Sequence, residues 1–119
     1  MGLIKSYRDL KVWQKGLDLV ILCYSHTSFF PKEEQYGLTN QIRRCAVSIP
    51  SNIAEGYGRS STADYKRFLH MALGSLYELQ TQIEIAKRLN YLTENAFVEI
   101  DSMSIELDKM LYSLIKKIN

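Results

Sequence analysis

The sequence predicts an all-α fold, an up-down-up-down antiparallel four-helix bundle formed by one domain over residues 1–119. Of the residues, 46% are hydrophobic, and the chain has only six Gly and two Pro, which favours helices over a turn-rich sheet. Apolar residues recur at spacings of three and four through four long segments. Connections of a few residues join these segments without an intervening strand pattern, so consecutive helices should run antiparallel.

The first helix is predicted over residues 7–28. Ser6 can cap its start, with Asp9 three residues later as the capping-box partner. Pro31 should end it, because proline lacks an amide donor and pushes Phe30 out of helical geometry. The predicted core stripe is Leu10, Trp13, Leu17, Val20 and Tyr24.

The second helix is predicted over residues 33–57, with Glu33 and Glu34 near its positive end. Pro50 lies inside the apolar pattern, so the chain must either kink or start a new helix there. The pattern continues from Ile49 into the next turn, which favours one helix kinked at Pro50. Gly56 and Gly58 are expected to end it in left-handed geometry. Its predicted inner stripe is Leu38, Ile42, Cys45, Ile49 and Ile53.

The third and fourth helices have the clearest starts. Ser61, with Asp64 as its capping-box partner, should begin a helix that ends near Asn90, and Thr93 should cap the last one. The third helix holds its heptad with Tyr65, Leu69, Ala72, Leu76, Leu79, Ile83 and Ala86. The fourth has Phe97, Ile100, Ser104, Leu107, Leu111, Leu114 and Ile118 in the same register.

Charge is unevenly distributed along a chain whose net charge is only +2. Residues 1–15 hold four basic residues and one acidic residue, whereas residues 94–108 hold five acidic residues and no basic one. Basic residues also cluster in sequence around the predicted connection between the second and third helices. They are Arg43, Arg44, Arg59, Lys66 and Arg67. One interpretation is a nucleic-acid-binding surface that contacts phosphates without base specificity; the other is a solvated surface with ion pairs to Glu55 and Asp64.

Known catalytic patterns of helical bundles are missing, so no catalytic, metal-binding or cofactor-binding residue is predicted. Di-iron bundles need Glu-x-x-His motifs, but neither His26 nor His70 follows a glutamate by three residues. Arg67 and His70 are too close for the Arg-His pattern of bundle nucleases, and neither a Glu-x-x-Glu pair nor a phosphate-binding glycine loop occurs. The sequence therefore predicts a protein that is not an enzyme.

Two further groups of residues have structural and functional interpretations. Ser51, Asn52 and Glu55 follow Pro50 and could bind a ligand at the bend, or satisfy backbone groups freed by the proline while Glu55 pairs with an arginine. Cys23 and Cys45 lie in apolar helical patterns, which predicts buried thiols in a reducing compartment. With no stretch approaching the roughly 18 apolar residues of a membrane span, the expected location is the cytoplasm.

Several motifs carry a family resemblance: residues 41–59 (QIRRCAVSIPSNIAEGYGR), preceded by DLKVW at 9–13 and followed by RFL at 67–69 and GSLYEL at 74–79. Together they resemble small bacterial four-helix-bundle proteins encoded in ribosomal RNA intervening sequences and, more distantly, the accessory variability determinants of diversity-generating retroelements. The resemblance implies a homo-oligomer, specifically a homopentamer. In the retroelement branch it implies a basic surface that works with a reverse transcriptase and nucleic acid, RNA or DNA.

These observations predict a non-enzymatic oligomeric accessory protein that associates with nucleic acid through a basic surface. The alternative is a structural or interaction module with a protein partner and no nucleic-acid binding. Independent support for a homo-oligomer comes from apolar residues of the fourth helix outside its inner stripe. They are Val98, Met103, Ile105, Met110, Tyr112 and Ile115.

Overall fold

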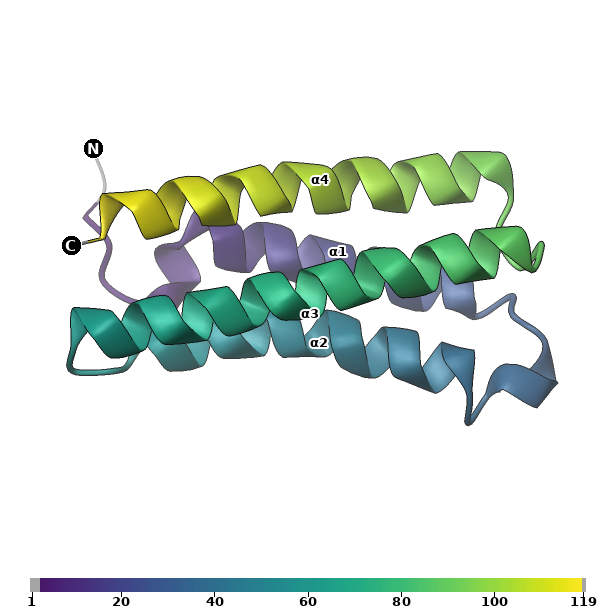
Figure 1. The fold of residues 1–119 in the computed structure, drawn as a ribbon, viewed down its shortest axis with the longest axis horizontal. Coiled ribbons are helices and arrows are strands. Elements are labelled where there is room, and N and C mark those ends of the chain that lie inside the picture. Colours follow the sequence, from purple (N-terminus) through teal and green to yellow (C-terminus); the bar gives the residue numbers. More distant parts are fainter. Residues whose placement is uncertain (1–2, 119) are drawn as a thin grey trace.

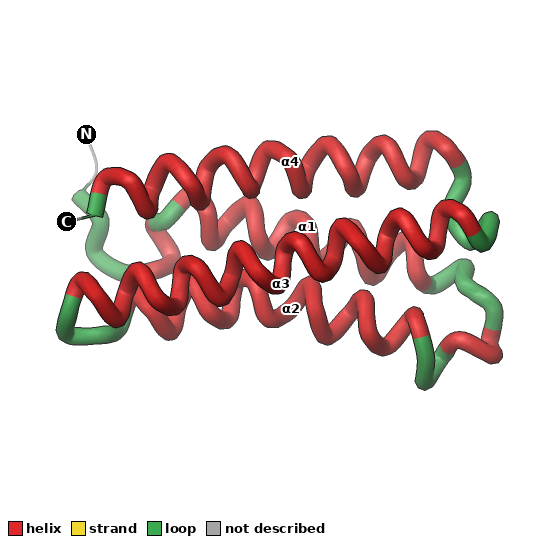
Figure 2. The backbone as a smooth tube through the Cα atoms, viewed as in Figure 1, coloured by secondary structure: helices red, strands yellow, loops and turns green. Residues whose placement is uncertain are grey.

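The computed structural model describes residues 3–118 and confirms the all-α antiparallel bundle. Its helices are α1 (Lys11–Thr27), α2 (Leu38–Tyr57), α3 (Thr62–Arg88) and α4 (Glu94–Lys117). They run up and down along a body of 43 × 27 × 20 Å (Figure 1). Each helix contacts its two neighbours in the order α1, α2, α3, α4 and back to α1, which gives a four-sided bundle. The parts outside helices are loops and turns, with no strand in the part described (Figure 2).

The predicted N-caps of the last two helices are confirmed, but the predicted capping box at Ser61 forms only in part, because the Asp64 carboxylate pairs with Arg67. The Ser61 hydroxyl accepts a hydrogen bond from the Asp64 amide at 3.1 Å, and the Thr93 hydroxyl accepts one from the Ala96 amide at 3.1 Å. Ser6 and Asp9 also form a capping box, but it closes the short 3-10 helix η1 (Tyr7–Asp9). The predicted start of the first helix at residue 7 is therefore wrong. Leu10 is extended, with φ −74° and ψ 126°, and separates η1 from α1.

The second helix begins later than predicted, at Leu38 instead of residue 33. Lys32–Glu34 forms the 3-10 helix η2, and Glu34 acts on the start of α2 from outside that helix. Its Oε1 accepts a hydrogen bond from the Leu38 amide at 3.0 Å, while its Oε2 accepts one from the Tyr91 hydroxyl at 2.9 Å. The hydrogen bonds from Leu38 and then Tyr91 lower the pKa of Glu34. This carboxylate thus connects α2 to the α3–α4 connection.

Pro50 lies inside α2, as the continuous apolar pattern predicts. The helix passes through it without a break from Leu38 to Tyr57. The proline ring is buried against Gly16 of α1, where a Cβ placed on the glycine would lie 3.4 Å from the Pro50 Cβ. Helix α1 can therefore lie close to the proline without a collision.

Two glycines near the end of α2 differ from prediction. None of the glycines described has positive φ, and Gly58 is right-handed at φ −79°. Gly56 is buried within the helix beside Phe68 of α3, so its role is close packing and the predicted left-handed termination is wrong. The positive φ, 64°, occurs at Asn90, where the Tyr91 amide donates back to the Ala86 carbonyl and terminates α3.

The core stripes of α2, α3 and α4 agree largely with prediction, whereas that of α1 does not. Ile42, Ile49 and Ile53 of α2 are fully buried, and α3 and α4 bury most of their predicted positions. Of the predicted stripe of the first helix, Leu10 is buried and Trp13 and Val20 are partly buried against the core, but Leu17 and Tyr24 are exposed. The buried face of α1 is Val12, Gly16, Leu19, Cys23 and Thr27.

Candidate nucleic-acid interface

Arg43 is bound to the end of α1. Its Nε donates a hydrogen bond to the Thr27 hydroxyl at 2.9 Å, and its Nη2 donates to the Tyr24 carbonyl at 3.3 Å. The guanidinium also lies 4.5 Å from the centroid of the Tyr24 ring. A cation at the carbonyl end of a helix is favourable. Arg43 therefore has a structural role in joining α1 to α2.

Arg44 lies on another face of α2, toward α3. It is exposed and lines a groove with Glu78 of α3. Because successive residues of a helix are about 100° apart around its axis, Arg43 and Arg44 leave α2 in different directions. The two adjacent arginines thus belong to different surroundings.

Arg59 and Arg67 meet at the connection between α2 and α3. Their guanidinium carbons lie 4.6 Å and 4.7 Å from the ring centroid of Phe68. Each is also paired locally: Arg59 with Glu55 at 2.9 Å, and Arg67 with Asp64 at 3.1 Å. Those are the ion-pair partners expected under the solvated-surface interpretation. Lys66 is partly buried beside this group.

The five predicted basic residues do not form one cluster. Arg59, Lys66 and Arg67 lie at the α2–α3 connection, whereas Arg44 is thirteen residues before the end of α2. At about 1.5 Å per residue, that separates it by about 20 Å along the helix. Arg59, Lys66 and Arg67 therefore share one end of the bundle, as predicted for several of the five. Arg43 and Arg44 lie further back along α2.

The structure adds basic residues that sequence reasoning did not connect. The start of α1, the α2–α3 connection and the end of α4 meet at the end of the bundle that carries both termini (Figure 1). We call this the basic end and define it as residues 3–12, 54–68 and 108–118. It holds nine basic residues, Lys5, Arg8, Lys11, Arg59, Lys66, Arg67, Lys109, Lys116 and Lys117, against four acidic ones, Asp9, Glu55, Asp64 and Asp108. Its net charge is +5, which leaves −3 for the rest of a chain of net charge +2.

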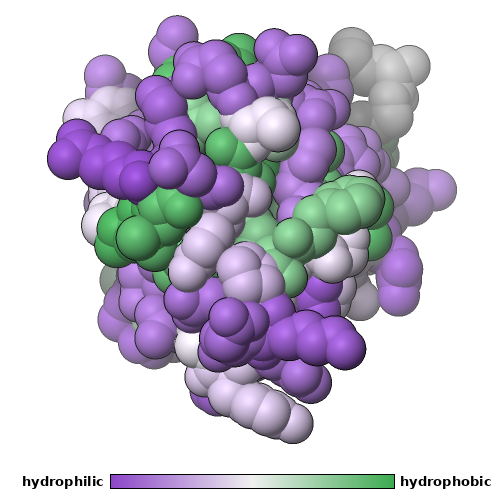
Figure 3. Space-filling view, turned by 90° about the vertical axis from the view of Figure 1, so that its right-hand side faces the viewer, coloured by the Kyte–Doolittle hydropathy of each residue, from purple (hydrophilic) through white to green (hydrophobic). Residues whose placement is uncertain are grey.

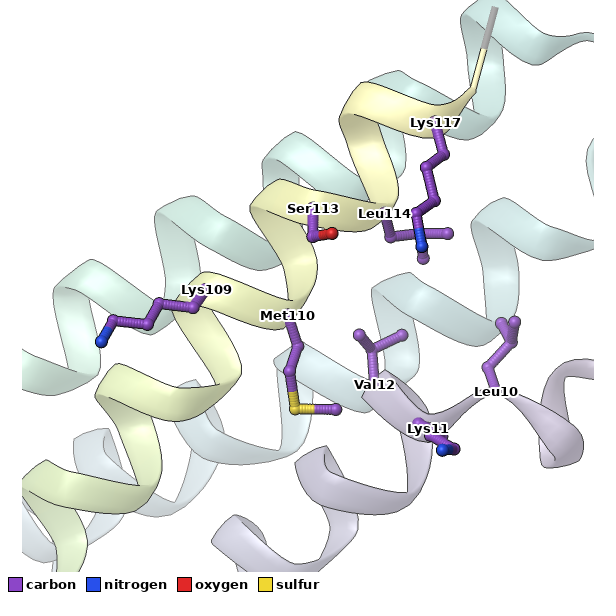
Figure 4. Close-up of a pocket in the computed structure, with 8 residues that line it drawn as sticks. All are labelled: Leu10, Lys11, Val12, Lys109, Met110, Ser113, Leu114 and Lys117. Carbon is purple, nitrogen blue, oxygen red and sulfur yellow. The ribbon is translucent and has the colours of Figure 1, made fainter.

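A groove of about 390 Å³ opens at the basic end between the start of α1 and the end of α4. Leu10, Val12, Met110 and Leu114 form its apolar lining, and Lys117 extends beside Leu114 (Figure 4). Lys11 and Lys109 also line it. Within residues 3–118, none of these three lysines forms an ion pair with a carboxylate. Their charge is available to an anionic partner.

The opposite end has a different surface. It is formed by the α1–α2 and α3–α4 connections, where apolar side chains reach the surface among hydrophilic ones (Figure 3). Phe29 is 83% exposed and Leu89 is 50% exposed. The two ends of the bundle therefore present different chemistry to solvent.

The acidic residues of α4 mostly have partners within the chain. Glu99 contacts His26 at 2.9 Å, Glu106 contacts Lys15 at 3.0 Å, and Asp108 accepts a hydrogen bond from Tyr77 at 3.0 Å. The bond to Asp108 raises the pKa of Tyr77. Helix α4 therefore presents less free negative charge than its sequence indicates.

The polar residues beyond Pro50 bond mainly to α2 itself. The Asn52 amide donates to the Ser48 carbonyl at 2.8 Å, and the Ser48 hydroxyl donates to the Cys45 carbonyl at 2.6 Å. Glu55 pairs with Arg59, and Ser51 is exposed. The predicted pairing of Glu55 with an arginine is confirmed, whereas the bonded carbonyls are those of Cys45 and Ser48 and not that of Ala46, four residues before Pro50.

The described chain offers neither a metal cluster nor a membrane-spanning helix. Within residues 3–118, no three His, Cys, Asp or Glu side chains gather in an arrangement that could hold a metal ion. None of the helices described is long and apolar enough to cross a membrane.

Sequence and structure comparisons relate this chain to known proteins. Residues 8–113 match the sequence model of the 23S rRNA-intervening sequence protein family. The chain belongs to this family. It is also similar to a crystal structure from Bacteroides thetaiotaomicron VPI-5482, described as a protein of unknown function from the S23 ribosomal protein family. The two share 28% sequence identity with a TM-score of 0.81, over 89% of this chain and 96% of the other. No curated protein matches the chain.

The family match covers the predicted basic residues of α2 and α3 but only part of the basic end. Lys5, Lys116 and Lys117 lie outside residues 8–113. The family match therefore covers most of the four helices, whereas these three lysines add positive charge just outside the matched residues.

Proposed function

We propose that this member of the intervening-sequence family is a non-enzymatic accessory protein that associates with nucleic acid through its basic end. The observation that carries the proposal is the charge separation, +5 at the basic end against −3 for the remainder. Phosphate backbones attract such a surface without base recognition, and release of their counterions drives binding. Among the contacts we propose are Lys11, Lys109 and Lys117, which line one groove and form no ion pair within residues 3–118.

Helix α4 supplies an argument against the alternative function. A protein-interaction module would be favoured if the acidic helix of a neighbouring subunit neutralised the basic surface. However, Glu99, Glu106 and Asp108 already bind partners of their own chain. We therefore favour nucleic acid over an acidic protein surface as the partner. A reverse transcriptase partner stays a prediction of the retroelement resemblance.

The protein is further proposed to act as a homo-oligomer, with five subunits as the number implied by resemblance. Exposed apolar residues support self-association: Ile21 of α1 is 69% exposed, and Val98, Ile105 and Tyr112 of α4 are also exposed. In contrast, Met103, Met110 and Ile115 pack against the core of their own subunit. Repetition of the basic end in every subunit would increase the avidity for a polyanion.

The test is a mobility shift on structured RNA and duplex DNA over a range of salt concentrations. The variant Lys11→Gln/Lys117→Gln removes two positive charges from the basic end, and Lys32→Gln/Lys87→Gln removes two from the opposite half as a matched control. Every phosphate of duplex DNA that a variant no longer neutralises should reduce the salt slope by about 0.9, so the first variant should show a slope lower by up to about 1.8. Absence of any shift at low salt and micromolar protein, or equal weakening in both variants, would refute the proposal.

A further inference from the structure

A polar groove on the α2–α3 face lies away from the basic end. It has a volume of about 420 Å³, which is within the range of small-ligand sites. Asn40, Gln41 and Arg44 of α2 line one side, and Glu78 and Gln82 of α3 line the other. The groove is closed below by Cys45, whose thiol donates to the Ser75 carbonyl at 3.0 Å and approaches the Glu78 Oε1 at 3.5 Å.

Three polar side chains of this groove have few partners among the described residues. Gln82 is only 7% exposed, and its buried Oε1 accepts no hydrogen bond. A buried acceptor without a donor is destabilising and is uncommon in folded proteins. Arg44 and Glu78 line the same groove, yet they form no ion pair with each other or with any other described residue.

The two oxygens of the Glu78 carboxylate offer neighbouring acceptors, and the Gln82 amide lies one turn away on the same face of α3. Arg44 offers a cation across the groove, and Asn40 and Gln41 offer amide donors. A complementary ligand needs two neighbouring N–H donors, an adjacent acceptor and an anionic group. A guanine nucleotide has all of these: its N1–H and 2-amino group lie side by side, O6 is the next acceptor, and its phosphate is anionic.

We propose that this groove binds one unpaired guanine of an RNA strand. The Glu78 carboxylate accepts hydrogen bonds from N1–H and the 2-amino group, Asn40 and Gln41 donate to O6, and Arg44 contacts the phosphate. The Gln82 side chain lines the same groove one turn further along α3. The inference rests on the proposed nucleic-acid function and adds base selectivity to it. It also gives Arg44, which lies apart from the basic end, a separate role.

The sharpest test uses mononucleotides, which are too small to reach the basic end and the groove together. Binding of GMP, IMP and AMP to the full chain is measured by calorimetry at low salt. IMP lacks the 2-amino group and should bind more weakly than GMP, and AMP should bind at least about tenfold more weakly than GMP, because a good bidentate contact discriminates bases by this factor or more. In NMR spectra, the side-chain amide signals of Gln82 should shift with GMP.

Two variants separate base recognition from phosphate attraction. Glu78→Gln removes a negative charge, so general attraction for phosphate should increase, yet GMP binding should fall to the AMP level. Glu84→Gln makes the same charge change on α3 outside the groove and serves as the control, which should keep the preference for GMP. Arg44→Gln should weaken the binding of GMP, IMP and AMP by similar factors, because Arg44 contacts the phosphate that all three share.

The outcomes also separate this inference from the proposed function. Equal affinities for the three nucleotides, no binding at millimolar concentration, or an unchanged preference in Glu78→Gln overturns the guanine site. RNA binding that depends on Lys11 and Lys117 without guanine preference also overturns the site but leaves the basic end in place. A GMP preference in a chain that binds no RNA supports the groove and refutes the proposed function.

Discussion

Gly56 of α2 lies directly against Phe68 of α3. A Cβ placed on Gly56 would be 2.6 Å from the Phe68 Cβ and 3.3 Å from the Tyr65 carbonyl oxygen. The Phe68 Cβ is fixed to the backbone, so the collision cannot be relieved by a change in the ring alone. This contact sets how closely α2 and α3 approach beside Arg59 and Arg67.

Gly56→Ala should therefore destabilise the protein. Overpacking costs about 1–3 kcal/mol, and a contact of 2.6 Å with a Cβ places Gly56→Ala in the upper part of that range, above the gain of about 1 kcal/mol in helix propensity from glycine to alanine. Gly74→Ala is the matched control, because no atom lies within 4 Å of a Cβ placed there. Urea denaturation should show a lower unfolding free energy for the first variant and a gain for the second. Equal gains in both would contradict the close packing.

Glu34 should make stability depend on pH in the acidic range. Its pKa is lowered in the folded state by hydrogen bonds from Leu38 and Tyr91. The resulting stabilisation is complete above the unfolded-state pKa, about 4.3, and is lost as the pH falls through the lower folded-state value. Glu34→Gln should unfold at lower urea concentration than wild type at about pH 6, and the difference should shrink toward about pH 3. A difference that is constant with pH would argue against the role of the charged carboxylate.

Both cysteines should be unreactive in the folded protein. Burial raises the pKa of Cys23 and Cys45 to about 12, and the negative charge of Glu78 adds to the effect at Cys45. The thiolate is the nucleophile. A disulfide reagent at about pH 8 should therefore react slowly with the native protein. In urea, which unfolds the chain, it should react readily with both thiols. Rapid native reaction of one thiol would show that its helix opens locally.

Self-association should depend on the exposed stripe of α1. Leu17, Ile21 and Tyr24 are 38%, 69% and 42% exposed and lie on one side of the helix. Ile21→Glu should reduce the mass measured by light scattering without loss of helical content, whereas Leu89→Glu, at another exposed position, should not. If wild type is a monomer at micromolar concentration, the oligomer prediction fails.

Local signals in the sequence were sufficient for much of the fold. Ser61 and Thr93 act within their own turns, so their caps could be read without tertiary information. The stripe of α1 was mispredicted because nearly every position from Leu19 to Cys23 is apolar, and several helical faces then fit the pattern equally well. In the sequence, Gly56 resembles a turn residue. The structure requires glycine there because Phe68 lies so close, and this contact exists only once α2 and α3 have packed together.

The candidate interface was less predictable because it too depends on how the helices pack. Sequence proximity grouped Arg43 and Arg44 with Arg59, although a helix separates such residues along its axis and around it. Lys11 and Lys117 are almost the whole chain apart and come together only because four antiparallel helices return both termini to one end. The even number of helices was a sequence signal that could have revealed this meeting.

The excess of positive charge at one end of the 43 Å axis gives the protein an electric dipole. In a closed ring whose rotation axis runs parallel to the helices, every subunit points the same way, so all the basic ends line a single rim. Five copies would concentrate a charge of about +25 there, against about −15 distributed over the rest of the ring. A polyanion would therefore be attracted to one rim of such a ring and find no comparable positive charge on the other.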